Sequence, residues 1–559
     1  MEGKSDLITQ RTSRRGMIVP SKSIAWLVGF LLLAISLAAC SGGSSKPGAT
    51  TPDGLALVNE APKADKPLQN VQWGTTSAPT NLDPALGIDY SDEVRTNLCE
   101  SLLRFDTDGI LKPALAVSVD NPDPLTFVYT LRAGVRFWNG DEMTAEDVAY
   151  SLNRHLDPTF QSHFAVYFSN VRSVKVTGAR QVTVRMKRPD YLFPNELGTF
   201  AGAVVQRSYA ESKGKDFGTK SGGLMCTGPY QLDSWTSEAI VLKANPTYWN
   251  PKAQPKVARL TFRFIADEDT VTSALVAGDL DGATLYGSTA ATRLQRGTSG
   301  DLLYGMSTLD TQLITTKRAG PLKDQRVRQA LSIALPRAGI AKTTYANTAV
   351  PAKSIVSAIQ PWAYAPSIFK SYFEKRPLLS TSGDLAQARK LISAAKLNGA
   401  KITIAISAQY KDVSDVILET ANNIGLHASA VTLTDSDSVK LYFDEALRDR
   451  FDGFILPWNS NVSDPLENLV YFTPGGVYNY SGYNNPKYTA LVEKAVATAD
   501  PSKRAELDGE ALAILDADLP WIPIVDQPLL TYMSHKIGGG PVSLSGRNWS
   551  QWGAYLGGR

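Results

Sequence analysis

The chain has 559 residues, of which 43% are hydrophobic and 9% aromatic, so it is long enough for two or three globular domains. Its formal net charge of +3 comes from 57 basic and 54 acidic side chains. Residues 1–39 hold five of these basic and two of these acidic side chains, so the remainder is formally neutral. A neutral body lacks the positive charge that attracts nucleic acid, and we expect no nucleic-acid partner.

The N-terminal region contains an uncharged apolar run, 24–39, that follows three basic side chains, Arg14, Arg15 and Lys22. A membrane-spanning helix needs about 20 apolar residues, and this run is shorter. Its length and its basic flank are typical of a signal peptide. We therefore predict export, with a simple N-terminal membrane anchor as the alternative.

The apolar run ends in LAAC, which resembles the lipobox of bacterial lipoprotein signals. The resemblance implies that residues 1–39 are a signal peptide and that Cys40 is lipidated. Residues 40–69 are rich in Ser, Gly, Pro and Ala, which is typical of a flexible tether. We expect the protein on the outer face of the cytoplasmic membrane. The route, Sec or twin-arginine, and the start, Met1 or Met17, stay open.

Two further cysteines, Cys99 and Cys226, lie in the body of the chain. In an exported protein, two such cysteines are more often paired than free. We predict a disulfide between them, and two buried free thiols are the alternative.

Local patterns predict helices alternating with strands. A helix over 144–156 begins with a capping box, in which Thr144 and Asp147 bond to each other's backbone amides. His155 is predicted at the surface or boundary of this helix. Two alternating strands are predicted over 171–186. Further helices are predicted at 270–277, 326–335, 414–424, 487–498 and 502–518. This alternation indicates an α/β fold.

Motifs for catalysis or metal binding are missing from the sequence. The four histidines, at 155, 163, 427 and 535, show no metal-ligand spacing, and there is no HExxH or GxSxG motif. GTKSGG at 218–223 lacks the order of a phosphate-binding loop, and GDLDG at 278–282 lacks the later ligands of a calcium loop. We expect no metal, no cofactor and no enzymatic activity.

Seven segments in order along the chain resemble the dipeptide/oligopeptide-type extracellular solute-binding proteins of ABC importers, family 5. They are LKPALAVSV (111–119), FVYTLRAGVRFWNGDEMTAEDVAYSLNR (127–154), CTGPYQL (226–232), LKANPTYW (242–249), LVAGDLDGA (275–283), DQRVRQALSIAL (324–335) and the pair YNNPKYTALVEKA and LPWIPI within 483–524. Together they cover essentially the whole body.

The resemblance implies a two-lobed α/β fold like that of periplasmic binding proteins, a flytrap with an extra α/β subdomain on lobe I. The expected divisions are lobe I at 70–112, 193–267 and 525–559, the subdomain at 113–192, lobe II at 268–524, and the hinge near 266–269 and 522–526.

The resemblance also implies a ligand site between the lobes. In relatives that take peptides, an aspartate shortly after a tryptophan of lobe II meets the ligand's α-ammonium. Here Trp458 matches the tryptophan and Asn461 stands at the aspartate position, whereas Asp464 matches an Asp-Pro turn. An asparagine brings no compensating charge. Either another acid such as Asp89 takes the role, or the ligand has no free amine there.

The predicted ligand-binding residues are Asp89, Tyr410, Trp458, Asn459, Asn461 and Tyr480. Trp458 and the tyrosines, Tyr483 included, would stack on a sugar or cover a side chain, and each would serve equally as core.

The function implied by the resemblance is that of a monomeric, lipid-anchored substrate-binding protein. It would capture a peptide or peptide-like solute and deliver it to an ABC permease driven by its ATPase. The alternatives are a binding protein for an oligosaccharide or another polar metabolite, a ligand-presenting sensor lipoprotein, and an exported enzyme on the same scaffold.

Overall fold

The computed structural model describes residues 55–87, 92–296, 299–375, 379 and 382–559, which all belong to one compact unit, Pro47–Arg559. The predicted signal peptide at 1–39, Cys40 and Asp89 lie outside the described residues. Within the described part of the chain, no helix is long and apolar enough to cross a membrane.

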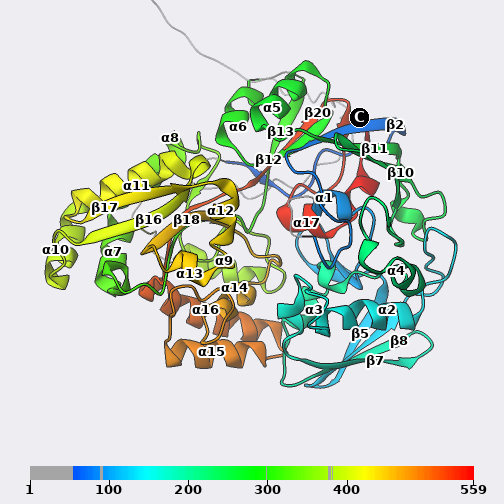
Figure 1. The fold of residues 1–559 in the computed structure, drawn as a ribbon, viewed down its shortest axis with the longest axis horizontal. Coiled ribbons are helices and arrows are strands. Elements are labelled where there is room, and N and C mark those ends of the chain that lie inside the picture. The colour runs from blue at the N-terminus through cyan, green and yellow to red at the C-terminus, as the bar shows by residue number, and fades with distance from the viewer. Residues whose placement is uncertain (1–54, 88–91, 297–298, 376–378, 380–381) are drawn as a thin grey trace, which may run out of the picture. The chain divides into compact units, whose positions relative to one another are not determined.

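An eight-stranded sheet, the first sheet, combines strands from the early and the late parts of the body (Figure 1). Its strands in spatial order are β1 (Leu57–Val58), β13 (Gly300–Gly305), β20 (Leu529–Ser534), β12 (Gly282–Leu285), β2 (Leu68–Thr75), β11 (Val257–Phe264), β10 (Ala239–Ala244) and β9 (Tyr230–Trp235). The accompanying helices are α1 (Asp92–Arg95), α4 (Arg207–Lys213), α5 (Glu268–Ala277), α6 (Ser288–Leu294) and α17 (Leu544–Trp549). β2 is parallel to β11 and β12, and β20 is antiparallel to β12 and β13.

A six-stranded sheet, the second sheet, is built from the middle of the chain. Its strands in spatial order are β15 (Val350–Pro351), β19 (Trp521–Asp526), β14 (Asp310–Thr315), β18 (Gly453–Trp458), β16 (Lys401–Ser407) and β17 (His427–Leu433). The accompanying helices are α7 (Gln325–Ala334), α8 (Arg337–Thr343), α9 (Pro366–Lys375), α10 (Leu385–Ala395), α11 (Lys411–Asn423), α12 (Asp435–Lys440), α13 (Glu445–Arg448), α14 (Pro465–Tyr471), α15 (Pro486–Val496) and α16 (Pro501–Asp518). β16 is parallel to β17 and β18, as expected of strands joined through helices.

A four-stranded antiparallel sheet forms a smaller unit. Its strands in spatial order are β5 (Ala116–Asp123), β6 (Thr126–Leu131), β8 (Gln181–Met186) and β7 (Val171–Gly178). Beside it lie α2 (Ala145–Asn153), α3 (Phe193–Glu196) and the short 3-10 helices η1 (Arg154–Leu156) and η2 (Ala165–Phe168). Two strand pairs complete the fold, namely β3 (Leu103–Phe105) with β4 (Leu111–Pro113) and β21 (Ile537–Gly538) with β22 (Gly557–Gly558).

The capping box predicted at Thr144 is confirmed. The Asp147 amide donates to the Thr144 hydroxyl at 3.2 Å, and the Thr144 amide donates to the Asp147 carboxylate at 2.9 Å. The helix nevertheless ends at Asn153, and the chain continues as the 3-10 turn η1.

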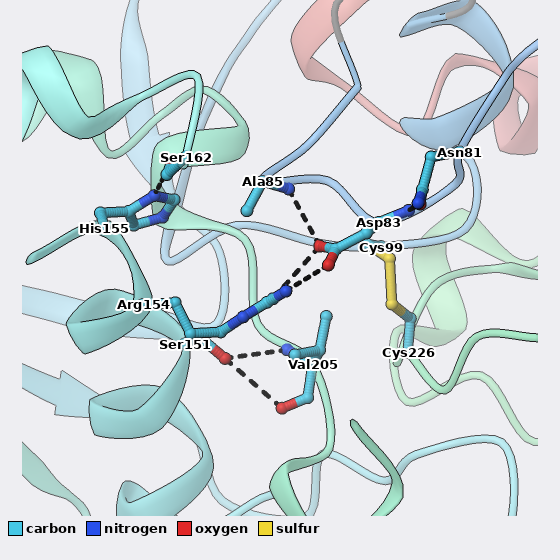
Figure 2. Close-up of polar contacts among 10 residues, drawn as sticks. All are labelled: Asn81, Asp83, Ala85, Cys99, Ser151, Arg154, His155, Ser162, Val205 and Cys226. Atoms are coloured by element: carbon cyan, nitrogen blue, oxygen red, sulfur yellow. Dashed lines mark hydrogen bonds and ion pairs between the residues drawn. A yellow bond between two sulfur atoms is a disulfide. The ribbon is translucent and has the colours of Figure 1, made fainter. Parts of the chain in front are cut away.

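His155, in this turn, was wrongly predicted at the surface or boundary. Its side chain is buried, stacked on Phe168, and its Nδ1 lies 2.6 Å from the Ser162 hydroxyl (Figure 2). Burial lowers the pKa of His155 to about 3, so the imidazole is neutral.

Two contacts, made by Arg154 and Ser151, join the four-stranded unit and its helix to the first sheet's loops, and a disulfide links two of those loops to each other (Figure 2). Arg154 forms a two-bonded ion pair with the buried Asp83. Cys99 and Cys226 form a disulfide. The Ser151 hydroxyl accepts from the Val205 amide at 3.0 Å.

The expected boundary between lobes at 267/268 falls inside the first sheet. β12 and β13 follow that boundary, yet they pair with β2 and β20 of the first sheet. The second sheet begins only at β14. Strand pairing depends on contacts far apart in sequence, which the segment resemblance does not contain.

Candidate functional site

The described chain passes between the two large sheets at two places, from β13 to β14 and from β19 to β20. The two passages are bonded to each other, because the Gln527 amide donates to the Leu309 carbonyl at 2.9 Å. The Gln527 side chain also donates to the Thr311 hydroxyl at 2.7 Å. A relative movement of the two sheets would therefore be absorbed in these few residues.

Two buried carboxyls lie at these passages. Asp310 and Asp526 are cross-strand partners on β14 and β19. Burial raises the pKa of Asp526 to about 8, and burial together with the Asp526 carboxyl raises the pKa of Asp310 well above its ordinary value. Gln312 donates to Asp310, and the Ala358 amide donates to Asp526.

The loop at 458–465 connects the end of β18 to α14, and it contacts residues near the first sheet. Asn461 is half-buried in this loop, and its side-chain amide donates to the Tyr167 hydroxyl at 2.6 Å. The Asn461 carbonyl accepts from the Trp549 indole of α17. Asn461, which the resemblance places opposite a ligand's ammonium group, is thus held between segments of η2 and α17.

Trp458 and Tyr480 are mostly buried in an aromatic cluster. Trp458 is 7% exposed, and its indole N–H donates to the Asn468 side chain at 3.1 Å. Tyr480 is 3% exposed and stacks on Trp521. The structure places these two predicted site residues together, in a cluster with Tyr442, Tyr471 and Tyr478.

The other predicted residues differ in their surroundings. Asn459 is exposed beside Trp458, and Tyr410 is half-buried at the end of η7 (Ala408–Tyr410), after β16. Tyr483 donates to the Asp518 carboxylate at 2.6 Å and packs on Tyr488.

Sequence reasoning missed Glu467, the carboxylate behind Asn461. Its Oε1 lies 3.4 Å from the Asn461 side-chain nitrogen and accepts from the hydroxyls of Tyr167 and Tyr471 at 2.7 and 2.8 Å. Its Oε2 accepts from the Val462 amide at 2.8 Å. Burial raises the pKa of Glu467, while these donors lower it. No local motif marks this residue, because Tyr167 is 300 positions away.

Two cavities among the described residues lie apart from the predicted ligand residues. One of about 310 Å³ is lined by residues of β2, β11 and α5 and the turn after α5, and one of about 180 Å³ is lined by β3, β4 and loops that include Glu100 and Trp249. In the described part of the chain, no group of three or more His, Cys, Asp or Glu side chains is arranged to hold a metal ion.

Over residues 111–480 the sequence matches the family described as bacterial extracellular solute-binding proteins, family 5 Middle. The chain belongs to this family. This family 5 protein is 26% identical over 483 residues to the glutathione-binding protein GsiB of Escherichia coli (strain K12), covering 82% of this chain and 89% of GsiB.

Solved structures share the fold of this family 5 protein. The periplasmic binding protein DppA from Helicobacter pylori in complex with peptide STSA matches with a TM-score of 0.74 at 20% identity, covering 87% of this chain and 98% of DppA. The binding protein AgaA from A. tumefacien R10, in complex with agropinic acid, matches with a TM-score of 0.73 at 19% identity, covering 88% and 99%. The fold is therefore that of the two-lobed periplasmic binding proteins, and we name the parts around the first and second sheets the first and second lobes.

Proposed function

We propose that this protein is the substrate-binding component of an ABC importer and captures a peptide or peptide-like solute between its two lobes. Family membership supports solute binding, and relatives that bind glutathione and a tetrapeptide support the peptide class. A permease and its ATPase would receive the solute. The family is one of binding proteins, which supports a role other than catalysis.

The observation that carries this proposal is the pairing of the 458–465 loop with the first lobe. Asn461 contacts Tyr167 through its side chain and Trp549 through its carbonyl. A solute held beside this loop would contact both lobes at once. Contacts made to both lobes exist only in the closed state, so binding would shift the population toward closure.

The proposed ligand residues of the second lobe are Trp458, Asn459, Asn461, Tyr410 and Tyr480. Since Trp458 and Tyr480 are mostly buried, they would shape and stiffen the wall of the site. Asn459 and Asn461 would offer amide groups to the ligand. Asp89 keeps its proposed role as an additional acid, outside the described residues.

Glu467, in its ionised form, would supply the negative charge that Asn461 lacks. A ligand's ammonium group could donate a hydrogen bond to the Asn461 side-chain oxygen. The Glu467 carboxylate would then lie on the other side of the same amide group, 3.4 Å from its nitrogen. A charge one side chain further away still attracts the ammonium inside a protein, though less than a direct partner would. The site therefore fits a solute with a free amine.

The test replaces Asn461 by Asp and uses two probes, the peptide STSA and its N-acetylated form. We expect Asn461→Asp to bind the free-amine peptide about tenfold more tightly, because a direct ion pair replaces a neutral acceptor. Without ligand the new carboxylate would face Glu467, so the melting temperature of the free variant should fall. Isothermal titration calorimetry and thermal unfolding measure the two effects.

Asn398→Asp, at an exposed turn of the second lobe, is the matched control and should change neither quantity. Equal affinities of wild type and Asn461→Asp for free STSA would contradict the placement of an ammonium at this loop. Failure of both peptide forms to bind would favour the alternative of a non-peptide solute, of the kind seen with AgaA.

The remaining expectations on anchoring and organisation are also proposals. Residues 1–39 would be the signal peptide, Cys40 would carry the lipid, and the protein would act as a monomer outside the cytoplasmic membrane. The lobes would follow the sheets, with the second lobe at 306–526 and the smaller four-stranded unit as the subdomain of the first.

A further inference from the structure

The two lobes also touch at a surface away from the passages, between the subdomain and the helices of the second lobe. The Tyr191 amide donates to the Val496 carbonyl at 2.9 Å, and the Asn195 side chain donates to Asp464 at 2.7 Å. The Tyr167 hydroxyl donates to Glu467 across the same surface. We call these contacts the closure interface. Figure 1 shows α3 and α14, which carry several of them, between the two parts of the fold.

The closure interface holds more negative than positive side chains. Four of its carboxyls are buried and a fifth, Asp190, is half-buried; the buried ones are Glu196, Asp464, Glu467 and Asp508. Two cations act on them, namely the buried Arg504, 3.8 Å from Asp464, and the exposed Arg188 near Asp190. Buried ionised carboxylates without matching cations are strongly unfavourable, so this surface favours the neutral, protonated form of its least compensated carboxyl.

Glu196, at the end of α3, is the least compensated of these groups. It is 7% exposed, and within the described residues its carboxyl has neither a hydrogen-bond nor an ion-pair partner. Burial, followed by the carboxyls of Asp190, Glu467 and Asp464, raises the pKa of Glu196 well above its ordinary value.

Among the described residues, the charged side chains that act on Glu196 are all acidic, namely Asp190, Glu467 and Asp464. The Tyr129 hydroxyl, on β6, is fully buried without a hydrogen-bond partner, and Glu196 helps to raise its pKa after burial. Burial, followed by the carboxyls of Glu467 and Glu196, raises the pKa of Tyr167, on η2. The Tyr167 hydroxyl donates a hydrogen bond to Glu467. From α16, Arg504 is directed at Asp464 and at the Tyr191 carbonyl.

We propose that closure of the two lobes takes up a proton at Glu196, so that acid favours the closed state and alkali favours opening even without ligand. When the lobes separate, Glu196 loses the carboxyls of Glu467 and Asp464 on the opposite side and gains water. Its affinity for a proton then falls. The closed state binds the proton more tightly, so by linkage a lower pH stabilises closure.

Hydrogen exchange of the full chain without ligand measures this equilibrium. The Tyr191 amide bonds to Val496 on the opposite side, so its protection reports closure when opening and closing are fast. With intrinsic rates corrected for pH, we expect its protection factor to be lower at pH 8 than at pH 5, by up to about tenfold per pH unit wherever Glu196 titrates. In Glu196→Gln, the Tyr191 amide should be as strongly protected at pH 8 as at pH 5.

Glu146→Gln, an exposed glutamate on α2, is the matched control and should keep the wild-type pH dependence. Amides of β16, inside the second sheet, serve as the internal reference for pH effects unrelated to closure. If Glu196→Gln does not fold, Glu467→Gln removes a carboxyl that faces Glu196 and should lessen the fall. Two results would overturn the proposal. One is a wild-type Tyr191 protection factor that changes with pH no more than those of the β16 amides, and the other is a folded Glu196→Gln or Glu467→Gln variant whose Tyr191 protection factor falls as much as in wild type. Since no ligand is present, this result is independent of the proposed solute.

Discussion

Single carboxyls at the passages between the lobes make the stability of this protein depend on pH. Asp526 ends β19 and faces Asp310 across the strand pair, and one Asp526 oxygen has no hydrogen-bond partner. Its pKa is about 8 in the folded chain, against an ordinary value of 3.8. The folded state therefore binds a proton that the unfolded state releases between these two values, and stability falls as the pH rises through that window.

Asp526→Asn removes this dependence while keeping the size of the side chain. We expect wild type to lose up to about 1.4 kcal/mol of unfolding free energy per pH unit through this group alone, and the variant to show a shallower slope. Urea unfolding between pH 5 and 8 measures both slopes. Asp412→Asn, at an exposed position on α11, is the control and should follow wild type. A variant slope as steep as that of wild type would contradict the role of Asp526.

Elements were predictable where the signal is local. α5 ends at Ala277, as predicted, with Gly278 after it in a left-handed conformation, and α16 begins at Pro501, one residue before the predicted start. The boundary at 267/268 was not predictable in this way, because β12 and β13 join the first sheet through strands such as β20, more than 200 positions later. The contacts of Asn461 with Tyr167 and Trp549 also join residues far apart in sequence, by 294 and 88 positions.

The disulfide between Cys99 and Cys226 is a link between elements whose energetic effect is testable. It closes a sequence separation of 127 residues, for which the chain-entropy account gives about 4–5 kcal/mol of stabilisation. Replacing both cysteines by serine should lower the unfolding free energy by about that amount, measured in urea. Wild type treated with a reductant should unfold at the same urea concentration as the variant. Unchanged stability in both would show that the link contributes nothing.

At the scale of the whole molecule, function depends on two connections between lobes. The passages near Asp310 and Asp526 join the lobes covalently, whereas the 458–465 loop and the closure interface join them only through side chains and hydrogen bonds. A solute that contacts both lobes would add only to the non-covalent contacts between them. It would therefore favour closure without altering either sheet.

In the proposed function this protein holds a small solute between its lobes, and native mass spectrometry of the full chain purified from its own host would detect that solute. We expect the chain to carry a small-molecule adduct that fragments as a peptide or peptide-like compound. The same adduct, added back to stripped protein, should increase the protection of the Tyr191 amide. A chain that carries no adduct, and whose Tyr191 protection is unchanged by STSA and by glutathione, would contradict the claim.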